Sequence, residues 1–179
     1  MEINNYKRYV ITGGSGAGKT TLVNALRNSI DVCIVKEPAT IVIDESFRTE
    51  SDLLPWIKLL EFVERVTEIG VEDFKTVPKD KNCFFDRGIP DSIAFLKLDN
   101  IDVPDWLVKA SNNYRYNTIF WAPPWKEIYV NTRDRPETLE FAEELGYLLR
   151  EVYNDLGYKV IEIPKDVLEN RVNFLLRSV

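Results

Sequence analysis

Five short apolar runs recur along the chain, and segments with helical spacing separate them. The runs, which predict β-strands, span residues 8–12, 32–36, 82–86, 118–122 and 159–163. Some are apolar at successive positions, as in Cys83-Phe84-Phe85, which is typical of a parallel strand covered by helices on both faces. The alternation of strand and helix predicts right-handed βαβ units and a three-layer α/β/α fold.

Apolar residues three or four positions apart predict the helices. The predicted helices span residues 19–29, 52–69, 89–98, 105–111, 136–156 and 166–176. Gly157 follows the fifth of them and is a good C-terminal stop. Residues 37–50, 70–81 and 123–135 are predicted to be loops.

Composition narrows the class of protein. A chain of 179 residues with 45% hydrophobic and 29% charged residues predicts one globular domain over residues 1–179. No apolar run approaches the roughly 20 residues that span a bilayer, and the N-terminus lacks a signal-peptide core. We therefore expect a cytoplasmic protein without a membrane segment.

Charge and residue usage exclude several kinds of chemistry. The net charge of −6 argues against a nucleic-acid partner, because such proteins usually present a basic face. Two separated cysteines and no histidine argue against a zinc site. The lack of histidine also removes Ser-His and Cys-His nucleophiles, so carboxylates must do any acid–base work.

The first strand leads into Gly13-x-x-x-x-Gly18-Lys19-Thr20, the Walker A pattern. Its glycines allow the backbone to form a nest of N–H groups for phosphate, and the following helix adds its positive N-terminus. Lys19 would bind the outer phosphates, and Thr20 would offer a hydroxyl to Mg²⁺. The expected nucleotide-binding residues here are Gly13, Gly14, Ser15, Gly16, Ala17, Gly18, Lys19, Thr20 and Thr21.

The second strand ends in Lys36-Glu37-Pro38. Ligands of open α/β sheets bind beyond the carboxyl ends of the strands, so Glu37 is expected beside the phosphate site. There its carboxylate could take the proton of a substrate hydroxyl or bind a sugar hydroxyl. The alternative is a solvated glutamate at a strand end.

The third strand ends in Asp86-Arg87-Gly88. An acid after an apolar strand is the Walker B arrangement, which holds Mg²⁺, so Thr20 and Asp86 are the expected metal ligands. Arg87 carries a planar fork suited to phosphate. The alternatives are an Asp86–Arg87 salt bridge or a cap for the next helix.

The 123–135 segment is both basic and aromatic. Arg133 and Arg135 precede a long predicted helix, and they could close over a nucleotide as a lid-like loop and neutralise charge during phosphoryl transfer. A solvated charged loop is the alternative. Trp125 and Tyr129 are expected to pack against the protein rather than stack on a base.

The blocks FDRGIPD (residues 85–91) and PPWKEIYVN (residues 123–131), together with Walker A and Glu37-Pro38, occur in one order. With these motifs in this order, the chain resembles the NadR-type AAA ATPase family, which consists of small P-loop proteins similar to the kinase domain of the nicotinamide-riboside kinase regulator. The resemblance implies a nucleotide-kinase-like P-loop NTPase with a parallel sheet in the order 2-3-1-4-5. It also implies ATP and Mg²⁺ binding at residues 13–20 and Asp86, with Arg135 as the lid arginine.

Two functions remain open on the sequence. The first is an Mg²⁺-dependent kinase that moves the γ-phosphate of ATP to a small-molecule acceptor, such as a nucleoside or nucleotide. The second is a regulatory ATPase switch without an acceptor. The sequence shows no Asn/Thr-Lys-x-Asp motif for guanine, which favours ATP. The catalytic candidates are Lys19, Glu37, Asp86, Arg87 and Arg135.

Overall fold

The computed structural model describes residues 6–29, 31–130 and 138–178. At its centre is a five-stranded sheet in the order β2-β3-β1-β4-β5, in which each neighbouring pair is parallel. The strands are β1 (Arg8–Gly13), β2 (Cys33–Val35), β3 (Cys83–Asp86), β4 (Thr118–Ala122) and β5 (Val160–Glu162). The predicted parallel sheet and its strand order are confirmed.

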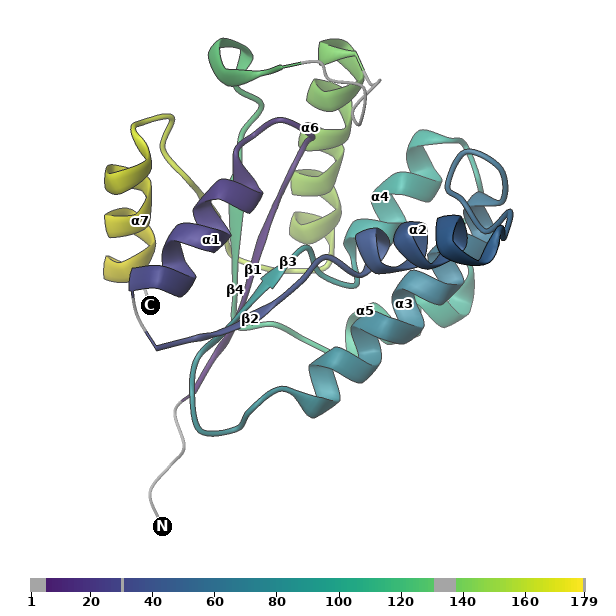
Figure 1. Cartoon of the computed structure of the whole chain (residues 1–179), viewed down its shortest axis with the longest axis horizontal. Helices are drawn as coiled ribbons and strands as arrows, with labels where there is room; N and C mark the ends of the chain where they lie inside the picture. The colour runs from purple at the N-terminus through teal and green to yellow at the C-terminus, as the bar shows by residue number, and fades with distance from the viewer. Residues whose placement is uncertain (1–5, 30, 131–137, 179) are drawn as a thin grey trace.

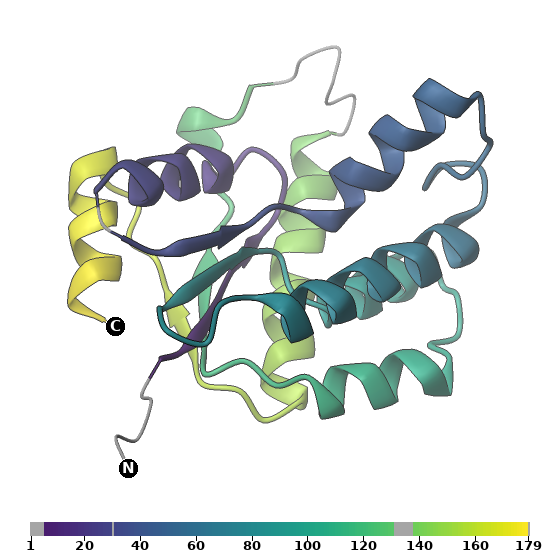
Figure 2. The same cartoon turned by 60° about the horizontal axis from the view of Figure 1, so that its bottom comes forward.

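Helices cover both faces of this sheet. They are α1 (Lys19–Ser29), α2 (Pro38–Thr49), α3 (Leu59–Thr76), α4 (Asp91–Leu98), α5 (Asp105–Asn113), α6 (Leu139–Asp155) and α7 (Leu168–Arg177), with a 3₁₀ turn at Lys126–Ile128. Helices α1 and α7 lie together on one face, and α3, α4, α5 and α6 lie on the other (Figures 1 and 2). Within the described residues, no helix combines the length and apolar character needed to cross a membrane.

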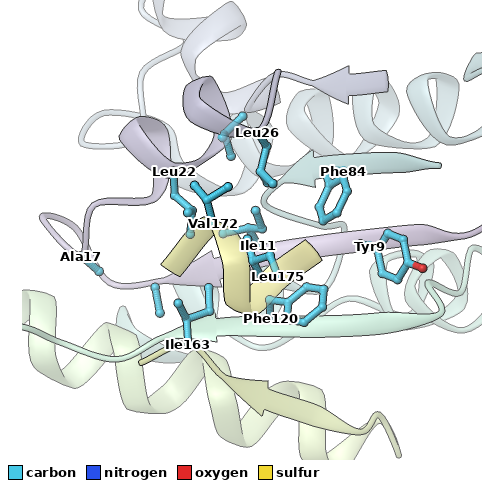
Figure 3. Close-up of a cluster of buried hydrophobic side chains, with 12 residues drawn as sticks. Tyr9, Ile11, Ala17, Leu22, Leu26, Phe84, Phe120, Ile163, Val172 and Leu175 are labelled. Carbon is cyan, nitrogen blue, oxygen red and sulfur yellow. The ribbon is translucent and has the colours of Figure 1, made fainter. Parts of the chain in front are cut away.

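Strand β1 runs through the middle of the core. Tyr9 and Ile11 point to the face covered by α1 and α7, where Figure 3 shows Ile11 beside Leu175 and Tyr9 next to Phe84. Val10 points to the opposite face and joins a cluster with Tyr153 of α6. Because successive side chains of a strand alternate between faces, β1 packs on both faces of the sheet. This packing fixes the position of its C-terminal end.

Helix α2 corrects the prediction of a loop at residues 37–50. Pro38 occupies its first turn, where a missing N–H costs nothing. Val42 and Ser46, one turn apart, are buried, and the Ser46 hydroxyl donates to the carbonyl oxygen of Leu53 at 2.8 Å. The sequence did not predict this helix because residues 40–43 are all β-branched, and β-branched residues disfavour helices.

Helix α3 starts and ends later than the predicted 52–69. Trp56 lies in the turns before it and is 65% exposed. The helix continues past Gly70, where a Cβ would lie only 3.3 Å from Ile89, so the glycine serves close packing and does not end the helix. Its last turn places Phe74 against the rings of Phe85 and Tyr116. The predicted loop at 70–81 is therefore wrong up to Thr76.

The other predicted helices are confirmed, α1 with its predicted bounds and the rest with shifted ends. Helix α4 begins at Asp91 rather than at Ile89. Helix α6 is described from Leu139, its cap Thr138 accepting from the amide of Phe141. Gly157, with φ of 75°, follows α6 as predicted.

Candidate functional site

The Walker A residues form the loop between β1 and α1. Gly13, Gly16 and Gly18 have φ values of 142°, 73° and 77°, which residues with side chains rarely adopt. A Cβ on Gly13 would lie 2.2 Å from the backbone oxygen of Ala122. The amides of residues 14–18 donate no backbone hydrogen bond to the described residues. They are therefore available to an anion.

Lys19 is the first residue of α1 and is 7% exposed. Its Nζ donates to the carbonyl oxygen of Gly14 at 2.8 Å. Burial, followed by the positive charge of Arg87, lowers the pKa of Lys19 to about 7. Thr20 and Thr21 are exposed in the same turn. The loop thus holds a buried ammonium group that an anion would stabilise.

Asp86 ends β3 beside Ile11 of β1. Its carboxyl group is buried, and Oδ1 has no hydrogen-bond partner among the described residues. Burial, and next the negative charge of Glu37, raises the pKa of Asp86. Burying a carboxylate oxygen that has no hydrogen-bond partner costs free energy unless a cation binds it. The donor set of this carboxylate and the Thr20 hydroxyl therefore fits Mg²⁺.

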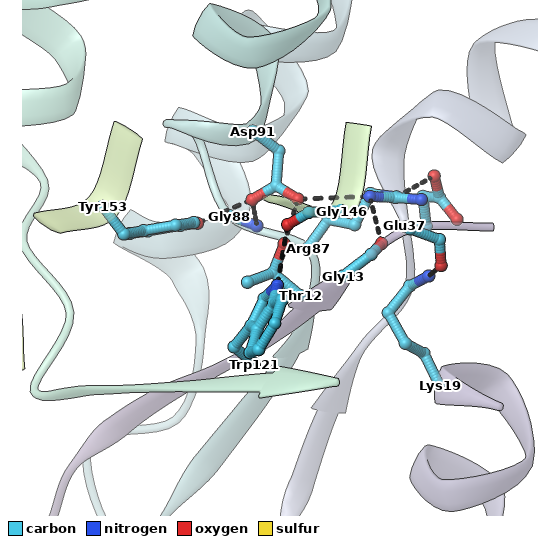
Figure 4. Close-up of polar contacts among 11 residues, drawn as sticks. Thr12, Gly13, Lys19, Glu37, Arg87, Gly88, Asp91, Trp121, Gly146 and Tyr153 are labelled. Atoms are coloured by element: carbon cyan, nitrogen blue, oxygen red, sulfur yellow. Dashed lines mark hydrogen bonds and ion pairs between the residues drawn. The ribbon is translucent and has the colours of Figure 1, made fainter. Parts of the chain in front are cut away.

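Arg87 follows Asp86 in a left-handed conformation, with φ of 70°. Its Nε donates to Glu37 Oε1 at 2.7 Å, and its Nη1 donates to the carbonyl oxygen of Gly13 at 3.3 Å (Figure 4). Burial lowers the pKa of Arg87, but Glu37 and Asp91 outweigh it and raise the pKa overall. The sheet thus brings Glu37 and Arg87 together at the phosphate loop, whereas the Asp86–Arg87 bridge considered above is not among the described ion pairs.

Asp91 is a central residue of the site that the sequence reasoning did not single out. Its Oδ1 accepts from the hydroxyl of Thr12 at 2.6 Å and from Arg87 Nη1 at 3.3 Å. Its Oδ2 accepts from the amide of Gly88 at 3.0 Å and from the hydroxyl of Tyr153 at 2.6 Å. The available signal was an acidic residue four positions after Arg87, at the start of α4.

A second arginine reaches the phosphate loop from α7. Arg171 is 4% exposed, and its Nη2 donates to the carbonyl oxygen of Ala17 at 3.0 Å. Its guanidinium lies 5.5 Å from the ring centroid of Trp125, and burial lowers its pKa. A Cβ on Gly16 would lie 2.6 Å from the ring of Tyr129. Trp125 and Tyr129 therefore pack beside the loop, as expected, but no sequence pattern indicated Arg171.

The two lid candidates lie outside the described residues. Arg133 and Arg135 belong to the 131–137 segment, so their roles stay predictions. The described residues contain no group of three or more His, Cys, Asp or Glu placed to bind a metal. A magnesium site built from one carboxylate and one hydroxyl is not of that kind.

A family model described as "AAA domain" matches residues 8–171, nearly the whole chain. The chain belongs to the AAA domain family. A comparison with curated protein sequences finds no significant match. Similarity to known proteins therefore shows the family and the fold of this AAA domain, and not its activity.

Three solved structures illustrate the similarity of fold. Deoxyadenosine kinase from M. mycoides, with products dCMP and dCDP bound, is 16% identical with a TM-score of 0.70, over 96% of this chain and 97% of that one. The NadR protein in complex with NR is 20% identical with a TM-score of 0.72, over 97% of this chain and 50% of that one. Thymidylate kinase from Ehrlichia chaffeensis is 18% identical with a TM-score of 0.62, over 96% of this chain and 97% of that one.

Proposed function

We propose that this AAA domain is an Mg²⁺-dependent kinase that transfers the γ-phosphoryl group of ATP to a hydroxyl of a nucleoside- or nucleotide-like acceptor. The observation that carries the proposal is the pairing of Glu37 with Arg87 beside the phosphate loop. A nucleotide-binding loop alone needs no such second carboxylate. The names of the kinases with the same fold point in the same direction.

The residues of the loop would bind and orient the triphosphate. The amides of residues 14–18 and the Lys19 ammonium group would hold its outer phosphates. Thr20 and Asp86 would hold Mg²⁺, which when bound neutralises charge on the phosphate oxygens. Filling the open Oδ1 of Asp86 would remove the cost of that buried oxygen.

Glu37 would act on the acceptor. Its side chain is 27% exposed and uses Oε1 for Arg87, and no described residue donates to Oε2. The acceptor oxygen would form a bond to the γ-phosphorus as the bond to the β-phosphate oxygen breaks, and the hydroxyl proton would pass to Glu37. Arg87 would stabilise charge on the transferring group. Arg133 and Arg135 would complete the site from the 123–135 loop, within one domain spanning residues 1–179.

A regulatory ATPase is the competing assignment, and one surface favours it. Phe47 and Trp56 are 63% and 65% exposed, and their ring centroids lie 6.4 Å apart. Two neighbouring exposed aromatic residues are typical of a surface that contacts a partner. That surface lies on α2 and on the turns before α3, away from the phosphate loop.

The deciding experiment measures ADP formation from Mg·ATP with and without a panel of nucleosides and nucleoside monophosphates. We expect at least one acceptor to stimulate ADP formation, with phosphorylated acceptor appearing in equal amount. Slow ADP formation that no acceptor changes would assign the protein to the regulatory ATPases. Lys19→Ala is the negative control, and Asp86→Asn should weaken Mg²⁺-dependent ADP binding measured by calorimetry, a readout independent of turnover.

A further inference from the structure

Asp91 occupies the point where four parts of the fold meet. Its carboxylate accepts hydrogen bonds from Thr12 of β1, from Arg87 and Gly88 after β3, and from Tyr153 of α6. Figure 4 shows these groups converging on it. The residue is 3% exposed, and two donors on each oxygen fill its acceptor positions. Asp91 therefore has no position left for a substrate.

Two of these bonds hold Arg87 from both ends. One binds the guanidinium at Nη1, and the other binds the amide of Gly88, directly after Arg87. The backbone of Arg87 has φ of 70°, a conformation that is strained for a residue with a side chain and that surrounding contacts must hold. The carboxylate of Asp91 supplies such a contact. It thus fixes both the backbone and the side chain of Arg87.

The consequence for Glu37 lies in how Arg87 can pair with it. A free guanidinium tends to bind both oxygens of a carboxylate. Because Nη1 is held by Asp91 and by the Gly13 carbonyl, the end-on pairing through Nη1 and Nη2 is excluded, and Arg87 turns its Nε edge to Glu37, where Nε donates to Oε1. The other Glu37 oxygen stays without a donor among the described residues.

We propose that Asp91 is a positioning residue for phosphoryl transfer, which holds Arg87 so that one oxygen of Glu37 remains open to the acceptor hydroxyl. The inference rests on the proposed function for its catalytic consequence. Its geometric content, that Asp91 controls the Glu37–Arg87 pair, stands without it. Tyr153 extends the same contact to α6, the helix that follows the 131–137 segment.

The first test is Asp91→Asn, which keeps the shape of the side chain and removes its charge. We expect kcat to fall 10- to 100-fold, with the KM for ATP and the Kd for ADP within threefold of wild type. Arg87→Lys removes the forked guanidinium, so Asp91→Asn added to it should cost less than threefold more. Because contacting residues that act as a unit are not additive, independent losses that multiply would overturn the proposal.

A spectroscopic arm separates this inference from the proposed function. The Nε–H signal of Arg87, assigned by its loss in Arg87→Lys, should shift or broaden in Asp91→Asn, whether or not the protein is a kinase. An unchanged signal refutes the positioning role. A shifted signal in a protein without acceptor-dependent turnover supports the geometry and refutes only the proposed function.

Two further variants guard against a general loss of structure. Tyr153→Phe removes one bond to Asp91 and should move the same Nε–H signal by a smaller amount, which keeps the test decisive if Asp91→Asn does not fold. Asn117→Ala removes the acceptor for the amide of Arg8 at the far end of β1. It should leave both kcat and the Arg87 signal unchanged, and if it moved them as much as Asp91→Asn does, the role of Asp91 would be merely structural.

Discussion

The two ends of β1 handle polar groups in opposite ways. At its start, the amides of Lys7 and Arg8 donate to the side-chain oxygens of Asn82 and Asn117 at 2.9 and 2.7 Å. The Arg8 guanidinium, whose buried Nε has no hydrogen-bond partner among the described residues, lies over the ring of Phe74 at 4.4 Å, which stabilises its charge. These contacts come from the chain itself and hold the start of β1 in place.

At the other end of β1 the chain leaves groups incomplete. The loop amides have no described backbone partners, Lys19 is a buried ammonium group with a lowered pKa, and Asp86 has an open buried oxygen. Folding does not recover the cost of burying such groups unless a ligand completes them. The difference teaches that the far end serves stability, whereas the loop end is organised for an anion and a cation together.

The largest expected effect comes from Glu37→Gln. We expect kcat to fall about 100-fold or more, since general bases typically contribute 10²- to 10⁴-fold, while the Kd for ADP changes less than threefold. Steady-state kinetics and calorimetry measure the two quantities. Glu45→Gln, an exposed change on α2, the helix that begins directly after Glu37, is the matched control. Equal losses of turnover and of ADP affinity would place Glu37 on the nucleotide side.

Lys19→Ala tests the loop end directly. Loss of a buried, charged hydrogen-bond donor should weaken ADP binding about 100-fold, or ~2.7 kcal/mol. ADP should then no longer raise the Tm of the variant. Lys36→Ala, an exposed change at the end of β2, is the control. Wild-type ADP affinity in Lys19→Ala would exclude the Walker A loop as the binding site.

The lowered pKa of Lys19, about 7, predicts a pH dependence of binding. A bound polyphosphate favours the ammonium form, so the pKa is higher in the complex than in the free protein. ADP affinity is therefore greatest below pH 7 and falls by up to about tenfold per pH unit above it, until the pKa of the complex is reached. Calorimetry in two buffers of different ionisation enthalpy should detect proton uptake above pH 7, and its absence would contradict the lowered pKa.

Arg171 tests whether the α7 side belongs to the nucleotide site. Arg171→Met removes the bond to the carbonyl of Ala17 and should weaken ADP binding about fivefold, ~1 kcal/mol. The unfolding free energy should change little, because Arg171 forms no ion pair with the described residues and an unpaired buried cation is itself costly. Arg171→Lys keeps the charge and should recover part of the affinity. ADP binding equal to wild type in Arg171→Met would reduce Arg171 to packing.

The smallest effect on function is expected at the far end of β1. Asn117→Ala should lower the free energy of unfolding by about 1 kcal/mol, since one hydrogen bond to a backbone amide is lost. Urea denaturation measures this change, and ADP affinity should not alter. A loss of ADP affinity in Asn117→Ala would show that the two ends of β1 are coupled and do not have separate roles.

Local sequence patterns predicted the elements with a strong hydrophobic pattern and missed those in which the pattern is weak. The apolar runs indicated the five strands, of which β1, β3 and β4 are buried on both faces, whereas the edge strands β2 and β5 are mostly half-buried. Helix α2 escaped prediction since only a narrow stripe, with Val42 and Ser46, faces inward. Gly70 suggested a helix end, but in the fold its small size admits Ile89 of the neighbouring segment. A glycine can thus end a helix or allow close packing within one, and the sequence alone does not distinguish the two roles.

The sequence by itself determined where a phosphate loop forms and which acids follow the strands, because glycine conformations and strand ends are local properties. Only the tertiary structure decided which of these groups meet. Glu37 and Arg87 lie 50 positions apart, and the donors to Asp91 come from three separate elements. Such contacts depend on the order in which parallel strands lie side by side and on how their crossover helices pack, and no residue spacing encodes that order.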